Sequence, residues 1–314
     1  MKVFGPVPSR RLGRSLGINN IPPKICTYSC VYCQLGNTID MRYEREVFFS
    51  PHEIYREVKE KIEKAREKGE RIDYITFVPD GEPTLDKELK EKIDMVKGLG
   101  PKVALITNSS LLFEKDVQEA LVGLDWISVK VDAITERVWK RVDRPHKALS
   151  LPDILKGIEE VRKGFRGVFT TETMIVEGIN DEAKELERIA SFIKKIDPDR
   201  AYISIPTRPP AESWVHPPSE RVINQAFQIF VSKGIDTEYL IGYEGSEFAF
   251  TGNAKEDILS ITSVHPMREE GVEEFLRKSK KDWEFIRELI EEGLLVELEF
   301  EGKKFYMRKL LGKR

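Results

Sequence analysis

The residues that most clearly indicate chemistry are three cysteines within one eight-residue segment. They are the only cysteines among the 314 residues, and they occupy the first, fifth and eighth positions of Cys26-Thr27-Tyr28-Ser29-Cys30-Val31-Tyr32-Cys33. Three thiolates can ligate three irons of a [4Fe–4S] cluster, whereas ordinary electron-transfer clusters take four cysteine ligands. The segment therefore predicts a cluster whose fourth iron keeps a coordination position open for another molecule.

Other roles for these cysteines remain open. A structural zinc site takes four Cys or His ligands, often as two separated pairs. The chain has four histidines that could approach in space, although all are distant in sequence: His52, His146, His216 and His265. A disulfide would leave one thiol over, and no secretory signal accompanies the cysteines. Buried apolar packing is the least specific role, but the segment has the composition of a loop.

The composition indicates a globular protein with a substantial core. The chain is 40% hydrophobic and 33% charged, with a net charge of −3 and a pI near 6.0. This mild acidity does not indicate a nucleic-acid-binding protein, although a local basic patch is compatible with it. No apolar run has the length of a membrane span, and the N-terminus lacks the apolar stretch of a signal peptide. We therefore expect a cytoplasmic protein without membrane contact, and the abundant Glu and Lys suit a thermophile.

Predicted strands and amphipathic helices alternate through most of the chain. Strands are expected at 73–78, 103–107, 126–131, 168–176 and 201–205, and helices at 51–68, 86–97, 114–121, 135–142, 152–163 and 181–195. With a strand that should precede Cys26, this gives six strand–helix units, a parallel sheet and right-handed crossovers. The pattern predicts an α/β fold, either a partial or a full (β/α) barrel, with active residues at the C-terminal ends of its strands.

The pattern changes near residue 251. Helices are expected at 257–261, 272–278 and 283–292, followed by a hairpin of residues 294–301 and 303–308 that turns at Glu301-Gly302. Three helices followed by a hairpin resemble a winged helix. The alternative is a small docking subdomain that covers one end of the barrel. We therefore predict two domains, residues 1–250 and residues 251–314.

Several motifs together carry a family resemblance. The pattern Cys-x3-Cys-x-aromatic-Cys, with Tyr32 as the aromatic residue, resembles the signature of the radical S-adenosylmethionine (SAM) superfamily. Gly81-Glu82-Pro83 resembles its Gly-Gly-Glu-Pro motif, Thr107-Asn108 its Thr-Asn-Gly, and Ser128-Val129-Lys130-Val131-Asp132 its fourth-strand segment. The chain departs from the family pattern at Asp80, which stands where the family motif has its first glycine.

The resemblance implies a partial (β/α)6 TIM-like barrel that holds a [4Fe–4S] cluster and SAM. It implies cluster ligation by Cys26, Cys30 and Cys33. Glu82 is expected to contact the SAM amino group and Lys130 its carboxylate; the alternative for Lys130 and Asp132 is a salt bridge at the barrel rim. The residues expected to bind the cofactor are Tyr32, Gly81, Glu82, Pro83, Asn108, Ser128, Lys130, Asp132 and Arg208. An external electron donor of the flavodoxin or ferredoxin type would be the redox partner.

The substrate is the least determined part of the prediction. The run from Pro6 to Gly17 is similar to a group of small radical SAM proteins often placed near the archaeal wyosine-base synthase of transfer RNA. That enzyme carries a second cluster, for which this chain has no cysteines left. One hypothesis is RNA modification, with phosphate contacts from a basic set: Arg10, Arg11, Arg14, Lys303, Lys304, Arg308, Lys309, Lys313 and Arg314. The other is an activase or peptide-modifying enzyme whose C-terminal module recognises a protein partner.

Overall fold

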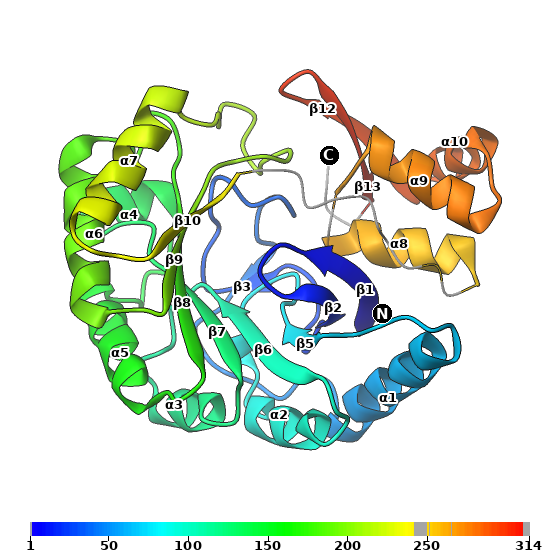
Figure 1. Cartoon of the computed structure of the whole chain (residues 1–314), viewed down its shortest axis with the longest axis horizontal. Coiled ribbons are helices and arrows are strands. Elements are labelled where there is room, and N and C mark those ends of the chain that lie inside the picture. The colour runs from blue at the N-terminus through cyan, green and yellow to red at the C-terminus, as the bar shows by residue number, and fades with distance from the viewer. Residues whose placement is uncertain (1, 242–249, 251, 265, 310–314) are drawn as a thin grey trace.

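A curved, mostly parallel sheet with helices on its outer side forms the larger part of the protein (Figure 1). The computed structural model describes residues 2–241, 250, 252–264 and 266–309. The eight strands lie in the order β1-β2-β5-β6-β7-β8-β9-β10. Strand β1 is antiparallel to β2, and every other neighbouring pair is parallel. The α/β fold with a parallel sheet is thereby confirmed.

The elements of this sheet and its helices alternate along the chain. The strands are β1 (Val3–Ser9), β2 (Gly13–Ile18), β5 (Tyr74–Phe77), β6 (Lys102–Thr107), β7 (Trp126–Lys130), β8 (Val168–Met174), β9 (Arg200–Ser204) and β10 (Thr237–Leu240). The helices are α1 (Pro51–Glu67), α2 (Leu89–Lys97), α3 (Lys115–Leu121), α4 (Glu136–Val142), α5 (Leu151–Gly164), α6 (Ala183–Ile196) and α7 (Glu220–Ser232). Two short strands, β3 (Ile25–Cys26) and β4 (Asp40–Met41), and the 3₁₀ helix η1 (Pro83–Leu85) lie in the loops.

The six expected strand units are present, with β2 as the strand before Cys26. The antiparallel edge strand β1 and the final unit α7–β10 were not predicted. Helix α6 shows why the central helices were recognisable, because Leu186, Ile189 and Ile193 recur at helical spacing and are all buried. Strand β2 carries glycine at its first and fifth positions, and such strands have weak intrinsic preference.

The turn between β1 and β2 fills the interior of the barrel. Leu12 is buried there in a small apolar cluster with Ala104, Trp126, Tyr202 and Leu240, which come from four different strands. The turn lies where β2 begins, whereas the cysteine loop follows the opposite end of β2. The N-terminal segment is therefore a plug that packs inside the barrel.

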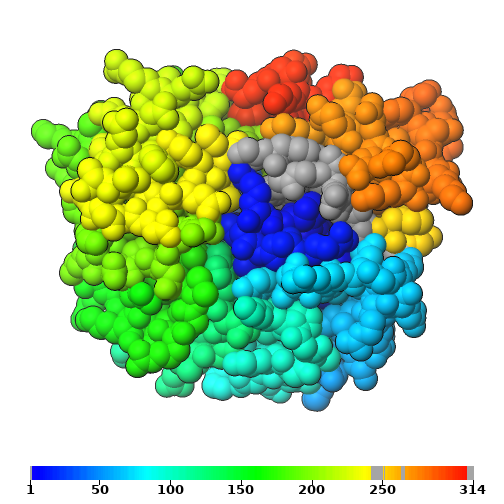
Figure 2. Space-filling view, in the orientation of Figure 1, coloured from blue at the N-terminus to red at the C-terminus, as the bar shows by residue number. Residues whose placement is uncertain are grey.

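A smaller unit follows the barrel and has its own apolar core. It contains α8 (Ala254–Val264), β11 (Met267–Arg268), α9 (Glu269–Ser279), α10 (Trp283–Glu291), β12 (Leu295–Phe300) and β13 (Lys303–Arg308). The expected hairpin is present, with Phe300 opposite Lys303, and β11 adds a third strand beside β13. The unit contacts the N-terminal hairpin, since Val7 packs against its core and α8 lies along β1 (Figure 1). In the space-filling view, the orange and red surface of this unit lies to one side of the barrel (Figure 2). Its winged-helix character and the division at residue 250 stay predictions.

Within the described part of the chain, no helix is both long and apolar enough to span a membrane.

Candidate active site

The three cysteines lie on the loop that follows the C-terminal end of β2. Cys26 ends the short strand β3, which pairs with β4, and the backbone amide of Cys33 donates to the carbonyl of Cys30 at 3.1 Å. All three are half-buried free thiols. Burial raises the pKa of Cys26 to about 12 and also raises that of Cys30, and the negative charges nearby add to both shifts. Metal binding would therefore have to drive off their protons.

The cysteines are not arranged around a single metal ion. Among the residues that the structure describes, no three His, Cys, Asp or Glu side chains form a group that could hold one ion. An iron–sulfur cluster needs thiolates that are spaced further apart, because each thiolate ligates its own iron. The mononuclear zinc site considered from the sequence requires convergent ligands.

Glu82 is held rigidly at the end of β5. Its Oε1 accepts hydrogen bonds from the hydroxyls of Thr84 and Thr107, both at 2.6 Å, and from the amide of Thr84 at 3.1 Å. Its Oε2 accepts from the amide of Asn108 at 2.7 Å. The side chain is only 1% exposed, and burial raises its pKa although these hydrogen bonds oppose the shift. The carboxylate is thus fixed in one orientation before any ligand binds.

Gly81 allows the Glu82 segment to lie directly against the cysteine loop. A Cβ atom at position 81 would lie 1.8 Å from the carbonyl oxygen of Ile25, the residue before Cys26. The amide of Glu82 donates to that same carbonyl at 3.3 Å. The contact requires glycine because the two backbones leave no room for a side chain. Pro83 then begins η1, and its carbonyl accepts a hydrogen bond from Asn20 at 3.0 Å.

Asn108 connects the end of β6 to the cysteine loop. Its amide nitrogen donates to Thr27 Oγ1 at 2.8 Å and lies 3.5 Å from Cys26 Sγ. Three of the residues predicted to bind the cofactor, Gly81, Glu82 and Asn108, therefore lie beside the first cysteine.

Two buried aspartates lie beside the second cysteine. Tyr32 donates a hydrogen bond to Asp132, which also accepts from the amide of Met174 at 2.7 Å. Asp143 lies 3.4 Å from both Cys30 Sγ and the Tyr32 hydroxyl. Burial raises the pKa of Asp143 well above its ordinary range, and Asp132 adds to the shift. Asp143 was not predicted, since nothing in its sequence neighbourhood marks it.

Lys130 and Glu172 form the charged centre of the barrel interior. Lys130 Nζ lies 3.1 Å from Glu172 Oε1 and 4.8 Å from the centre of the Tyr32 ring. Glu172 also accepts from Ser204 at 3.0 Å and from Arg11, whose guanidinium lies 3.5 Å from Ser128 Oγ. Burial alone would raise the pKa of Glu172, but Lys130 and Arg11 hold it far below its ordinary range.

Lys130 therefore makes the ion pair that was the alternative expectation, although its partner is Glu172 rather than Asp132. The same carboxylate keeps the pKa of Lys130 raised against the opposing effect of burial. Glu172 was missed by the sequence analysis. Its signal was one charged residue within an otherwise apolar and threonine-rich strand, Val168–Met174.

A cavity of about 340 Å³ joins the cysteine loop to the charged centre and the C-terminal unit. Its lining includes Cys33, Asp80, Lys130, Glu172, Arg268 and Phe305. Arg208, expected to bind the cofactor, lines it too and donates to Gln34 at 2.7 Å. The volume lies within the range of small-molecule sites.

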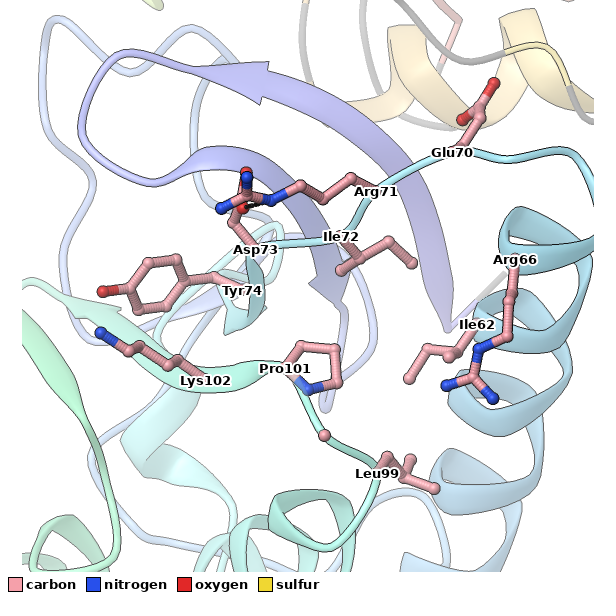
Figure 3. Close-up of a pocket in the computed structure, with 11 residues that line it drawn as sticks. Ile62, Arg66, Glu70, Arg71, Ile72, Asp73, Tyr74, Leu99, Pro101 and Lys102 are labelled. Atoms are coloured by element: carbon pink, nitrogen blue, oxygen red, sulfur yellow. Dashed lines mark ion pairs between the residues drawn. The ribbon is translucent and has the colours of Figure 1, made fainter.

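A second hollow, of about 460 Å³, lies where β5 and β6 begin, between these strands and α1 (Figure 3). Arg71 and Asp73 form an ion pair at its edge. The cysteine loop follows the opposite ends of the strands, so this larger hollow is not the reaction site.

The parallel barrel and the cysteine site define a class of protein, and the comparisons agree with it. Residues 20–210 match the Radical SAM superfamily, which is more than half of the chain. The chain belongs to this superfamily and is a radical SAM enzyme, a class that uses SAM and an iron–sulfur cluster. Its relatives include UPF0026 protein MJ1312 of Methanocaldococcus jannaschii, 46% identical over 309 residues that cover 98% of this chain and 96% of that protein.

Solved structures show the same fold at low sequence identity. A radical SAM methyltransferase from Sphaerobacter thermophilus matches with a TM-score of 0.56 at 16% identity, over 72% of this chain and 66% of that one. Streptococcus suis SuiB, bound to precursor peptide SuiA, matches with a TM-score of 0.53 at 11% identity, over 71% and 48%. These likenesses concern the barrel alone.

The residues present fit the cofactors of the class. Cys26, Cys30 and Cys33 would hold the cluster, and the fixed carboxylate of Glu82 offers acceptors to an ammonium group. The close approach at Gly81 and the amide of Asn108 beside Cys26 Sγ place these groups together. Hydrogen bonds to cluster sulfurs are one of the ways in which a protein adjusts its potential.

Proposed function

We propose that this enzyme reductively cleaves SAM at a [4Fe–4S] cluster held by Cys26, Cys30 and Cys33. One electron from the cluster would break the sulfonium–C5′ bond, giving methionine and a 5′-deoxyadenosyl radical that takes a hydrogen atom from the substrate. The observation that carries the proposal is the backbone contact between Gly81-Glu82 and Ile25-Cys26, which joins a fixed carboxylate to the cysteine loop.

The chain's own residues have distinct tasks in this reaction. Glu82 would accept hydrogen bonds from the SAM amino group, because its carboxylate already has a fixed orientation. Lys130 would attract the SAM carboxylate. This carboxylate would compete with Glu172, whose Oε1 lies 3.1 Å from Lys130 Nζ. Arg208 would border the same space from the loop after β9.

The proposal includes an electron supplied by another protein. The chain has one set of cysteines, which leaves none for a second cysteine-ligated cluster. An external donor of the flavodoxin or ferredoxin type is therefore the proposed redox partner.

A protein or peptide is the substrate class that the geometry favours over RNA. Arg11 pairs with Glu172 inside the barrel, and Arg14 pairs with Glu70 at 3.1 Å, so two of the three arginines expected to meet phosphate already have carboxylate partners. The third, Arg10, donates to the backbone carbonyl of Leu240 at 3.0 Å. Besides Arg10, the basic residues left for RNA are Lys303, Lys304, Arg308 and Lys309, with Lys304 already 3.3 Å from Glu297. Lys313 and Arg314 lie outside the described residues. The C-terminal unit contributes Arg268 and Phe305 to the cavity and would therefore contact the substrate.

Anaerobic reconstitution with iron and sulfide, followed by SAM and dithionite, tests the reaction. We expect 5′-deoxyadenosine and methionine from the wild-type protein, and neither from Cys30→Ser. A wild-type protein that holds a complete cluster and binds SAM but forms no 5′-deoxyadenosine would contradict the proposal. Strong transfer-RNA binding that weakens steeply with salt would favour RNA over protein as the substrate.

A further inference from the structure

Lys24 is a buried lysine two residues before the first cysteine. The residue is only 5% exposed, and its ammonium has no hydrogen-bond partner among the residues that the structure describes. Its backbone is fixed in the left-handed region at a φ of 67°, which is uncommon for a residue with a side chain. Its amide donates to the Asp80 carbonyl at 2.7 Å, and its carbonyl accepts from the amides of Ile39 and Asp40, both at 3.1 Å. The ammonium is thus held at this site by the backbone rather than by a side-chain partner.

The groups next to Lys24 belong to the cluster site. Lys24 lies two residues before Cys26, and its amide donates to the carbonyl of Asp80, which lines the cavity together with Cys33. Leaving a lysine ammonium buried without a hydrogen-bonded partner is costly. A bound cluster with its thiolates, which together carry negative charge, would supply the compensation.

Asp80 is the second unusual charge at this site. It is 3% exposed, it lines the cavity together with Cys33, and it stands where the family motif has glycine. A glycine would do for the backbone contact with Lys24, since that bond uses only the Asp80 carbonyl. The departure from the family pattern therefore adds a carboxyl group beside the lysine and the cysteines.

We propose that Lys24 and Asp80 set the reduction potential of the cluster, the lysine raising it and the aspartate lowering it. This inference rests on the proposed function and concerns its electron-transfer step. Reduction adds one electron to the cluster, breaks no bond and increases its negative charge. A fixed positive charge in a poorly solvated site stabilises the reduced form, and a negative charge opposes it. Lys24 acts on the cluster through its charge and does not react with substrate.

The test is the midpoint potential of the reconstituted cluster, titrated anaerobically with dithionite and followed by electron paramagnetic resonance. SAM is left out, so that contacts with the cofactor do not contribute. In Lys24→Gln we expect about tenfold less reduced cluster at a fixed potential, equal to a midpoint about 59 mV lower for one electron. Asp80→Asn should shift the midpoint in the opposite direction, the double variant should lie near the wild type, and Lys24→Arg should stay close to it.

A matched control removes the same charge elsewhere. Lys195 lies on the outer helix α6, is 64% exposed and pairs with Glu159, so Lys195→Gln should leave the potential unchanged. A purely structural role for Lys24 would change iron content or stability without this pair of opposite shifts. If Lys24→Gln does not hold the cluster, Asp80→Asn decides alone, because a rise in its potential supports the proposal and an unchanged value overturns it.

Failure of this inference differs from failure of the proposed function. Variants that carry complete clusters at the wild-type potential would overturn the role of Lys24 and Asp80 while leaving SAM cleavage intact. A wild-type protein that takes up no cluster would instead contradict the proposed function itself.

Discussion

Arg11 donates a hydrogen bond to Glu172 across 161 positions of the chain, and the pair lies inside the barrel rather than on its surface. The guanidinium of Arg11 also lies 5.8 Å from the centre of the Trp126 ring and 5.9 Å from that of Tyr202. These contacts fix the N-terminal turn to three later strands, β7, β8 and β9. Removal of Arg11 would leave Glu172 with the single positive charge of Lys130, and removal of Glu172 would leave both cations buried without this carboxylate.

Substitution Arg11→Met should therefore lower the free energy of unfolding strongly. Breaking a buried ion pair costs about 3–5 kcal/mol when it leaves a charge uncompensated. Lys130 stays beside Glu172 in this variant, so we expect a loss toward the lower end of that range. The matched control is Arg200→Met, since Arg200 is 43% exposed in its pairs with Asp236 and Glu238, and surface pairs contribute about 0–1 kcal/mol. Urea unfolding followed by circular dichroism measures both. Equal losses in the two variants would contradict the buried role of Arg11.

The same site predicts a dependence of stability on pH. Because Lys130 and Arg11 depress the pKa of Glu172 in the folded protein, the unfolded chain takes up a proton at this residue first as the pH falls. The stabilisation by Glu172 is complete above the ordinary glutamate pKa of about 4.3 and is lost as the pH falls toward the folded pKa. Stability curves measured from pH 6 to pH 3 should be steeper for the wild type than for Glu172→Gln. Parallel curves would show that Glu172 titrates alike in both states.

Substitution Gly81→Ala should separate the Glu82 segment from the cysteine loop. The new Cβ would lie 1.8 Å from the Ile25 carbonyl oxygen, so one backbone must move. We expect a large loss of iron uptake on reconstitution, together with lower stability. Gly164→Ala is the control, because Gly164 ends helix α5 and an added Cβ meets nothing within 4 Å. Normal iron content in Gly81→Ala would show that the contact is dispensable.

Substitution Glu82→Gln places an amide where the neighbouring groups donate hydrogen bonds. Two threonine hydroxyls and two backbone amides donate to this carboxylate. Glutamine keeps only one oxygen, so at least one of these donors would face an NH2 group and lose its acceptor, at a cost of about 1–3 kcal/mol. SAM affinity, measured by calorimetry on the loaded protein, should fall as well. Glu182→Gln serves as control, because Glu182 is exposed and makes no capping hydrogen bond. Unchanged SAM affinity in Glu82→Gln would remove this residue from the proposed binding site.

The barrel and the cysteine loop could be predicted from the sequence, because both depend on local patterns. Helices such as α6 repeat buried residues every three or four positions, and the cysteines lie within eight positions of each other. Long-range pairs left no such pattern. The partners Arg11–Glu172 and Cys30–Asp143 are brought together only by the closing of the sheet. The arginines of the N-terminal run were therefore assigned to phosphate, a role that the paired Arg11 and Arg14 do not leave open in this structure.

The plug formed by the β1–β2 turn also bears on how the chain folds. The turn is synthesised before its contacts Trp126, Glu172, Tyr202 and Leu240, which all come from the second third of this sequence or later. Contacts between distant parts of a sequence slow folding, because a long loop must be closed before they form. The turn therefore cannot form these contacts until the strands that carry them, β7 to β10, have been synthesised. Final insertion of Leu12 and Arg11 would then be a late event that locks the finished barrel from within.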